Sequence, residues 1–214
     1  ETRAKLPWIR ARLPESAEIL DVGCGGGFLS NALSAEGFTV TAIDRSEESL
    51  RVAERWDSTK RVRYLPADAA ALPFPDGSFG AVTAMDMLEH VEDPGRVIAE
   101  CSRVLRPGGV FFFSTLNRSF TAWLVGIQLV KWLVRNADPD MHAYRLFLKP
   151  SELHDLCTRH GLDLLELTGL RPRFSTVPPQ SYLTGIVPQN MEFMLTPSLR
   201  LLYMGQAIKS GPKA

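Results

Sequence analysis

Residues 19–28 read Ile-Leu-Asp-Val-Gly-Cys-Gly-Gly-Gly-Phe, a short apolar run that ends at an acid and is followed by four glycines in five positions. The next segment, residues 29–36, has the composition of a helix start. Glycines between a strand and a helix let the backbone approach a ligand closely, as in nucleotide sites. The stretch therefore predicts a strand, a ligand-binding turn that contains Gly23 and Gly25, and a helix.

Two side chains of this stretch bear on the identity of the ligand. A dinucleotide fingerprint G-x-G-x-x-G that begins at Gly23 needs a glycine at position 28, where the chain has Phe28. We expect Phe28 to push the helix and the strand apart. The carboxylate of Asp21 repels a pyrophosphate but suits the ammonium and sulfonium groups of S-adenosylmethionine. The sequence thus favours this methyl donor, and a nicotinamide oxidoreductase is the disfavoured alternative.

Acids also follow the next two strand-like runs. The run at residues 38–43 is followed directly by Asp44, and the run at residues 62–65 is followed by Asp68 and Ala69. An acid at the first position can accept hydrogen bonds from both ribose hydroxyls, and Asp68 can accept one from the adenine amine. The plainer alternative for each acid is a surface carboxylate or a helix cap.

Two further residues are candidates for donor binding. Arg3 lies twenty residues before Gly23 and could reach the carboxylate of the donor, although a frayed terminus is the plainer alternative. Met85 follows a fourth strand-like run at residues 79–84. We expect it to form an apolar or backbone contact with the donor.

Strand-like runs alternate with helical patterns along the chain. The runs lie at residues 18–22, 38–43, 62–65, 79–84, 110–115 and 162–168, with a last one at residues 199–208. This alternation predicts an α/β fold in which helices cover both faces of a doubly wound, mostly parallel sheet. Ligands should bind at the carboxyl ends of its strands. We expect a single domain over residues 1–214.

Two segments fall outside this minimal fold. Residues 119–146 carry apolar side chains at helical spacing, with tryptophans close to basic residues. Residues 119–135 are therefore either an interfacial helix that contacts a membrane or a cap helix that packs on the core. Residues 169–198 are rich in proline and predict an irregular loop on the substrate side.

Composition narrows the class of protein. The chain has 214 residues, is 45% hydrophobic and carries no net charge, which indicates one large core and gives no support for nucleic-acid binding. Its three cysteines lack the paired spacing of a disulfide framework or a zinc site. No signal peptide or spanning segment is evident. We expect a cytoplasmic protein, with peripheral contact to the inner face of the membrane through residues 119–135.

The candidates for chemistry are Asp86, Glu89 and His90, which follow the fourth run. If this segment turns helically, the three side chains face one side. Such a set can hold a divalent cation such as Mg²⁺ and leave positions open for a catechol, whose hydroxyl pKa the cation would lower. A metal-free alternative makes His90 the general base. In a third alternative, Glu89 and His90 have only a structural role and brace the loop that follows the fourth run.

The segment from Asp21 to Gly27, together with Asp44, Asp68 and the turn at residues 105–109, resembles the class I S-adenosylmethionine-dependent methyltransferases over residues 15–168. Three motifs at residues 84–94, 113–118 and 147–150 are similar to the ubiquinone-biosynthesis O-methyltransferases. The resemblance implies a seven-stranded Rossmann-like sheet, with the last strand antiparallel beside strand six and a helical cap insertion.

The resemblance also implies the metal cluster, although the family pattern is Glu-x-x-Glu-His and this chain has Asp86 at the first position. The expected activity is O-methylation of a hydroxylated aromatic, a polyprenyl catechol or phenol of ubiquinone biosynthesis. Two alternatives stay open. One is a methyltransferase for another lipid or natural product, and the other is a non-catalytic module that binds S-adenosylmethionine.

Overall fold

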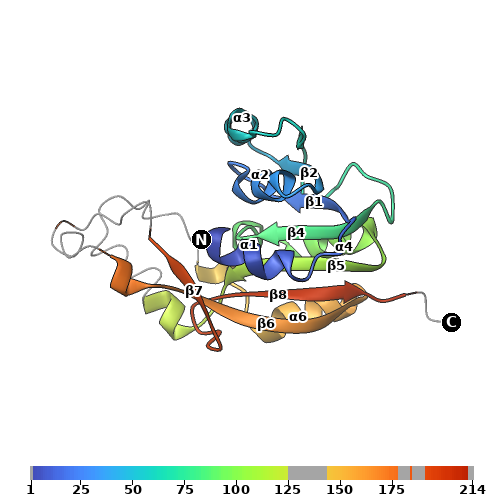
Figure 1. Ribbon diagram of the computed structural model, residues 1–214. Coiled ribbons are helices and arrows are strands. Elements are labelled where there is room, and N and C mark those ends of the chain that lie inside the picture. Colours follow the sequence, from blue (N-terminus) through green and yellow to red (C-terminus); the bar gives the residue numbers. More distant parts are fainter. Residues whose placement is uncertain (1, 125–143, 178–183, 185–190, 212–214) are drawn as a thin grey trace.

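The computed structural model describes residues 2–124, 144–177, 184 and 191–211. Its strands form one sheet in the order β3-β2-β1-β4-β5-β8-β6-β7 (Figure 1). The strands are β1 (Glu18–Val22), β2 (Thr39–Asp44), β3 (Arg63–Pro66), β4 (Phe79–Met85), β5 (Leu105–Leu116), β6 (Leu162–Pro172), β7 (Phe193–Thr196) and β8 (Leu202–Lys209). The helices are α1 (Thr2–Arg10), α2 (Phe28–Ala35), α3 (Glu47–Trp56), α4 (Pro94–Val104) and α6 (Pro150–Arg159), with short 3-10 turns at η1 (Leu88–His90), η3 (Tyr144–Leu146) and η4 (Phe174–Thr176).

The first five strands form the parallel part of the sheet. The chain runs outward from β1 to β2 and β3, then crosses back so that β4 pairs with the other edge of β1 and β5 pairs with β4. The order therefore reverses between β1 and β4, which is where doubly wound sheets bind their ligands. The last strand, β8, is antiparallel and lies between β5 and β6. The expected fold class and the antiparallel last strand are confirmed.

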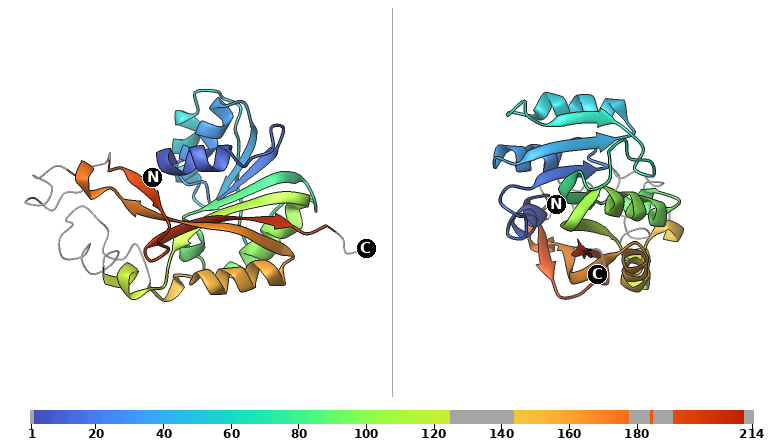
Figure 2. Two further views of the ribbon diagram at one scale, coloured as in Figure 1. Left: turned by 60° about the horizontal axis from the view of Figure 1, so that its bottom comes forward. Right: turned by 90° about the vertical axis from the view of Figure 1, so that its right-hand side faces the viewer.

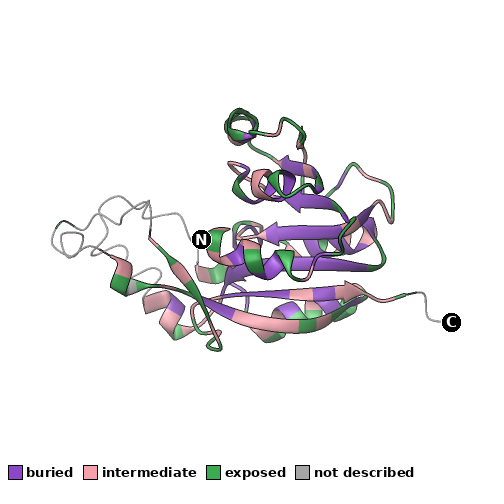
Figure 3. Cartoon of the chain, in the orientation of Figure 1, coloured by how far each residue is buried: buried purple, intermediate pink, exposed green. Residues whose placement is uncertain are grey.

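The core lies on both faces of the sheet because the central strands are apolar on both sides. In β5, Phe111 and Phe113 belong to one buried cluster and Phe112 to the other, as the two-residue period of a strand requires. Helices α1 and α2 cover one face, and α4 and α6 cover the opposite one (Figure 2). Figure 3 shows that the buried residues are concentrated in the central strands.

Part of the segment at residues 169–198 differs from the expected irregular loop, while its residues 178–183 and 185–190 lie outside the described part of the chain. β6 continues to Pro172, and β7 pairs with its end in antiparallel register, so the sheet has eight strands instead of seven. Gly169 permits this close pairing, because a Cβ atom there would lie 1.9 Å from the carbonyl oxygen of Ser198. β7 has four residues, which is too short for a period-2 pattern to stand out among prolines. The loop prediction was therefore wrong for residues 169–172 and 193–196.

Most of the predicted interfacial or cap helix lies outside the described residues. Its described beginning packs on the core, since Ala122 is buried with Leu116 and Phe147. Phe120 is 71% exposed beside Trp123, at 5.6 Å between ring centroids. Within the ranges that the structure describes, no helix is long and apolar enough to cross a bilayer.

Candidate active site

A pocket opens at the carboxyl ends of the central strands, where the sheet order reverses. Its wall comes from the turn after β1, the start of α2, the end of β4 and the first turns of α1. The lining residues are Thr2, Lys5, Asp21, Gly23, Cys24, Phe28, Leu29, Met85 and Asp86. Four of the residues predicted for donor or metal binding thus meet at one pocket: Asp21, Gly23, Met85 and Asp86.

The turn after β1 depends on its glycines for two different reasons. Gly25 has a φ of +51°, and a Cβ atom there would have no heavy atom within 4 Å, so the space above it is open. Gly27 has a φ of +73°, and a Cβ there would lie 2.6 Å from the Cβ of Ala53. Gly25 thus leaves the turn open on one side, and Gly27 allows α2 to approach α3 closely.

Phe28 does not act as the sequence predicted. Its side chain is 76% exposed at the beginning of α2 and contributes to the pocket wall, so it does not separate the helix from the strand. The glycine that allows close packing at the start of α2 is Gly27, where a Cβ atom would meet Ala53 of α3. The expectation for Phe28 was wrong, and the preference for a cationic donor therefore rests on Asp21.

Asp21 lies at the end of β1 with 3% of its surface exposed. Its carboxylate accepts hydrogen bonds from Ser30 Oγ of α2 at 2.5 Å and from Thr83 Oγ1 of β4 at 2.6 Å. Burial raises the pKa of Asp21, while the two hydroxyls oppose the shift. A ligand with a positive charge in this pocket would favour the ionised form. The site therefore fits the sulfonium or ammonium group of S-adenosylmethionine.

Asp44 lies at the end of β2, beside the glycine turn, as predicted. One carboxylate oxygen accepts a hydrogen bond from Gly25 N at 2.8 Å, and the other accepts one from Ser46 N at 2.8 Å. Each oxygen has a second lone pair, so both can still accept from a ribose diol. The residues of the turn and Asp44 together fit the nucleoside part of the donor.

Asp68 and Ala69 lie apart from the pocket lining. Asp68 is exposed, and its side chain accepts a hydrogen bond from Ala70 N at 2.9 Å, as in a surface turn. Ala69 is buried in the main core cluster. The loop that carries them joins β3 to β4 and is fixed to α4.

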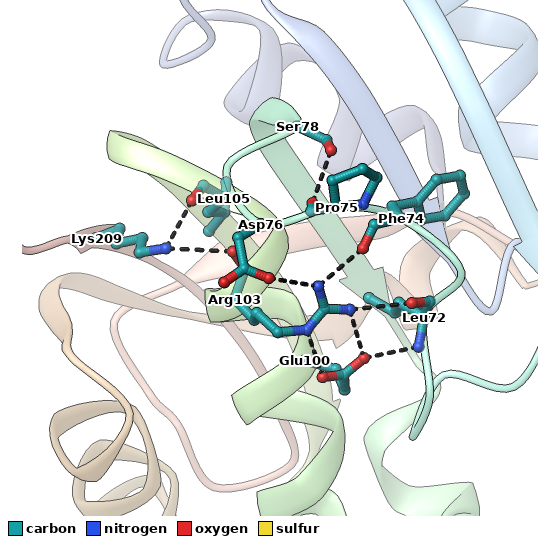
Figure 4. Close-up of polar contacts among 9 residues, drawn as sticks. All are labelled: Leu72, Phe74, Pro75, Asp76, Ser78, Glu100, Arg103, Leu105 and Lys209. Carbon is teal, nitrogen blue, oxygen red and sulfur yellow. Dashed lines mark hydrogen bonds and ion pairs between the residues drawn. The ribbon is translucent and has the colours of Figure 1, made fainter.

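Arg103, near the end of α4, holds the loop between β3 and β4 by several hydrogen bonds (Figure 4). Its guanidinium donates to the carbonyl oxygens of Leu72 at 3.0 Å and Phe74 at 2.8 Å. It also donates to Asp76 at 2.8 Å and to both carboxylate oxygens of Glu100 at 2.7 and 2.8 Å. These bonds raise the pKa of Arg103, and the hydrogen bond from Arg103 lowers the pKa of Glu100. Arg103 thus holds the loop between Leu72 and Asp76, together with Glu100, which accepts a hydrogen bond from Leu72 N at 2.7 Å.

We expect Arg103→Met to lower the free energy of unfolding by about 2–3 kcal/mol, because two loop carbonyls and the Glu100 carboxylate lose their donor together. Urea denaturation measures this loss. Arg51→Met is the matched control, since Arg51 is exposed on α3 and has only a 3.8 Å ion pair with Glu47. The control should stay within about 0.5 kcal/mol of the parent protein. Equal stability of the two variants would contradict the role given to Arg103.

Arg3 is exposed on α1 and does not line the pocket. The buried face of this helix consists of Lys5, Trp8 and Ile9, which follow helical spacing. Thr2 and Lys5 are the residues of α1 that reach the pocket. Sequence analysis missed Lys5, and the signal that could have found it is a cation on the apolar face of a helix.

Lys5 is 3% exposed, and its ammonium forms an ion pair with Asp86. It also donates to Ser114 Oγ at 3.0 Å, and Ser114 Oγ donates to the other oxygen of Asp86 at 2.7 Å. Asp86 has a φ of +53°, an uncommon conformation for a residue with a side chain. The first of the three predicted metal ligands is therefore engaged by a lysine.

Glu89 and His90 lie in different environments, since the first is buried and the second is exposed. Glu89 is 2% exposed and accepts a hydrogen bond from Thr115 Oγ1 at 2.7 Å. Burial, followed by the nearby charge of Asp86, raises the pKa of Glu89 to about 7. His90 is exposed. The three residues were expected on one side of a helical turn, but the segment forms a three-residue 3-10 turn that begins after Asp86.

The side chains of Asp86, Glu89 and His90 consequently do not fit a divalent cation. Throughout the part of the chain that the structure describes, no three His, Cys, Asp or Glu side chains gather closely enough to hold a metal ion. The metal site expected at Asp86, Glu89 and His90 is therefore not formed by the observed geometry.

Comparisons with known proteins identify the family of the chain. Residues 20–113 match the family model described as Methyltransferase domain. A protein of Thiobacillus denitrificans named ubiquinone biosynthesis O-methyltransferase is 42% identical over 171 residues, which cover 78% of this chain and 73% of that protein. A protein of Methylococcus capsulatus with the same name is 41% identical over 175 residues, which cover 80% of this chain and 73% of its own.

Solved structures support the same fold. An S-adenosylmethionine-dependent methyltransferase from Mesorhizobium loti superposes with a TM-score of 0.64 at 23% identity, covering 94% of this chain and 96% of that one. One from Methanosarcina mazei gives a TM-score of 0.65 at 24% identity, covering 95% and 97%. With the sequence relatives, the doubly wound sheet and the pocket at its switch point, these findings establish that the chain belongs to the class I S-adenosylmethionine-dependent methyltransferases.

Proposed function

We propose that the protein transfers the methyl group of S-adenosylmethionine to an oxygen of a hydroxylated aromatic, and that the acceptor is a polyprenyl catechol or phenol of ubiquinone biosynthesis. The observation that carries this proposal is the identity of about 40% to relatives named ubiquinone biosynthesis O-methyltransferase, over nearly four fifths of the chain. A methyltransferase for another lipid or natural product is the second candidate.

The donor would occupy the pocket between the glycine turn and Met85. Asp44 would accept hydrogen bonds from the ribose, and the space above Gly25 would admit the nucleoside. Asp21 would provide the negative charge that faces the cationic end of the donor. Asp68, on the clamped loop after β3, would accept from the adenine amine. These contacts hold the donor for an in-line displacement, for which alignment is the main requirement.

The acceptor must lose a hydroxyl proton before or during transfer. Because Asp86, Glu89 and His90 do not converge on one point, we favour the metal-free alternative, in which His90 takes this proton. Glu89, buried next to it along the chain, would hold the loop after β4 through Thr115. Met85, which would contact the methyl donor, and His90, which would take the proton, then lie on one short segment.

A polyprenyl acceptor resides in a membrane, so peripheral membrane contact through residues 119–135 belongs to the proposal. Its support among the described residues is Phe120, exposed next to Trp123. Cosedimentation with anionic vesicles tests it, with Phe120→Ser as the comparison. If the parent protein stays in the supernatant, the protein does not bind such membranes by itself.

The acceptor class is tested by a panel of three compounds with S-adenosylmethionine. We expect mass spectrometry to detect methylated product from a short-tailed prenyl catechol or phenol, at least about tenfold more than from the same ring with its hydroxyls blocked or from a non-aromatic prenyl alcohol. If donor binding is demonstrated but only the non-aromatic compound reacts, the proposed acceptor is wrong.

A further inference from the structure

Two buried hydroxyl groups hold the acid at the end of β1. Ser30 and Thr83 are fully buried, and both donate to Asp21, the first to Oδ2 at 2.5 Å and the second to Oδ1 at 2.6 Å. Each carboxylate oxygen therefore has its own donor. Both distances lie in the range of hydroxyl groups that donate to an ionised carboxylate. The two hydroxyls thus fix the orientation of Asp21 in the wall of the donor pocket.

The two hydroxyls come from different elements that meet at the carboxyl end of β1. Thr83 is the register partner of Asp21 in the parallel pairing of β1 with β4. Ser30 lies in the first turn of α2, shortly after the glycine turn. The strand pairing and the start of the helix thus bring one donor to each oxygen of the carboxylate.

The surroundings of Asp21 oppose its negative charge. Burial raises the pKa of Asp21, and the nearby charge of Asp44 adds to this shift. The hydroxyls of Ser30 and Thr83 act in the opposite direction and lower the pKa, because they donate to the ionised form. The charge of Asp21 therefore depends on these two hydroxyls and on the cation of a bound ligand.

Further titratable groups interact with Asp21 or share its pocket. They are Cys24 of the glycine turn, Tyr64 of β3, Lys5 of α1 and Asp86 after β4. Burial raises the pKa values of Cys24 and Tyr64, so both groups are neutral near pH 7. Lys5 forms an ion pair with Asp86, which balances its charge. The pocket wall thus favours a ligand that brings its own positive charge to Asp21.

We propose that Ser30 and Thr83 are positioning residues that keep the Asp21 carboxylate ionised and aligned for the positively charged end of S-adenosylmethionine. The inference rests on the donor pose of the proposed function, but not on the identity of the acceptor. Where Asp21 is protonated beforehand, donor binding breaks its O–H bond. The electron pair stays on the carboxylate and the proton goes to solvent. Each hydroxyl reduces this cost, because it lowers the pH at which Asp21 takes up a proton.

Calorimetric titration with S-adenosylmethionine from pH 5 to pH 7.5 tests this role without an acceptor. The affinity of the parent protein should fall as the pH decreases and Asp21 becomes protonated. In Ser30→Ala and in Thr83→Val this fall should begin about one pH unit higher, so that each variant binds about tenfold more weakly at the acidic end. Thr83→Ser keeps a hydroxyl and should recover most of the affinity. Circular dichroism checks that each variant is folded.

Adenosine separates this role from general support of the turn, because it carries neither the sulfonium nor the ammonium group of the donor. Its affinity should change less than about threefold in Ser30→Ala and Thr83→Val. Ser34→Ala is the matched control, since Ser34 is a buried serine of the same helix and is hydrogen-bonded to Thr59. This control should bind both ligands as the parent protein does.

Two results would overturn the proposal. One is an equal loss of affinity for adenosine and S-adenosylmethionine, which would give the hydroxyls a structural role only. The other is the same pH dependence of S-adenosylmethionine binding in the parent protein and in both hydroxyl variants. Failure of every acceptor in a methyl-transfer assay would contradict the proposed function and leave these binding results unchanged.

Discussion

Replacing Asp44 with alanine is expected to weaken S-adenosylmethionine binding about 30-fold to 100-fold, the largest effect of any donor contact. The carboxylate already supports Gly25 and Ser46 through their backbone N–H groups, and it is placed to accept from the ribose. Hydrogen bonds to a charged group contribute about 1.5–3 kcal/mol each. The substitution also removes the hydrogen bond that supports the glycine turn. The lost ribose contact and the lost support of the turn both weaken donor binding.

Two comparisons separate these causes. Asp44→Asn keeps an acceptor for Gly25 N and should lose less affinity than Asp44→Ala. Asp68→Ala should lose at most about tenfold, because Asp68 is exposed and would make a single contact. Isothermal titration with S-adenosylmethionine gives the three dissociation constants. An unchanged constant for Asp44→Ala, or an equal loss in Asp68→Ala, would contradict the placement of the ribose beside β2.

Glu89→Gln is expected to change the pH dependence of stability by up to about 3 kcal/mol. The pKa of Glu89 is raised from 4.5 to about 7 by burial and by Asp86. The folded protein therefore retains this proton at pH values where the unfolded chain has lost it, and the free energy of unfolding falls as pH rises from about 4.5 to 7. The amide in Glu89→Gln does not ionise, so this decline should disappear.

Urea denaturation at pH 4.5 and pH 8 measures the effect. The variant and the parent protein should be about equally stable at the lower pH, and the variant should be more stable at the higher one. Glu92→Gln is the control, because Glu92 is exposed three residues further on. A stability difference between Glu89→Gln and the parent that is the same at both pH values would show that Glu89 does not titrate with a raised pKa.

The parts of the site that sequence could predict are those fixed by local pattern and by the geometry of parallel sheets. Asp21 and Asp44 each end an apolar run, and parallel strands bring their carboxyl ends to one edge of the sheet. The four glycines after β1 predicted the turn. Their individual roles were not predictable, because the need for Gly27 comes from Ala53 on another helix.

The parts that sequence did not predict depend on contacts between distant segments. The pair of Lys5 and Asp86 joins residues 81 positions apart, and no local period indicates it. The metal cluster was predicted from helical spacing, whereas the left-handed backbone at Asp86 and the short 3-10 turn direct its side chains apart. β7 was missed because a short edge strand among prolines has no distinctive pattern.

The most direct test of the central claim is methyl transfer from labelled S-adenosylmethionine to a short-tailed prenyl catechol, followed by mass spectrometry, in parallel with Mg²⁺ and with EDTA. We predict labelled product on the ring oxygen at similar rates under both conditions, because the described side chains of Asp86, Glu89 and His90 do not gather at one metal ion and His90 takes the proton in the proposed mechanism. Product that forms only with Mg²⁺ would contradict the metal-free mechanism. No product under either condition, with donor binding demonstrated, would contradict the proposed acceptor.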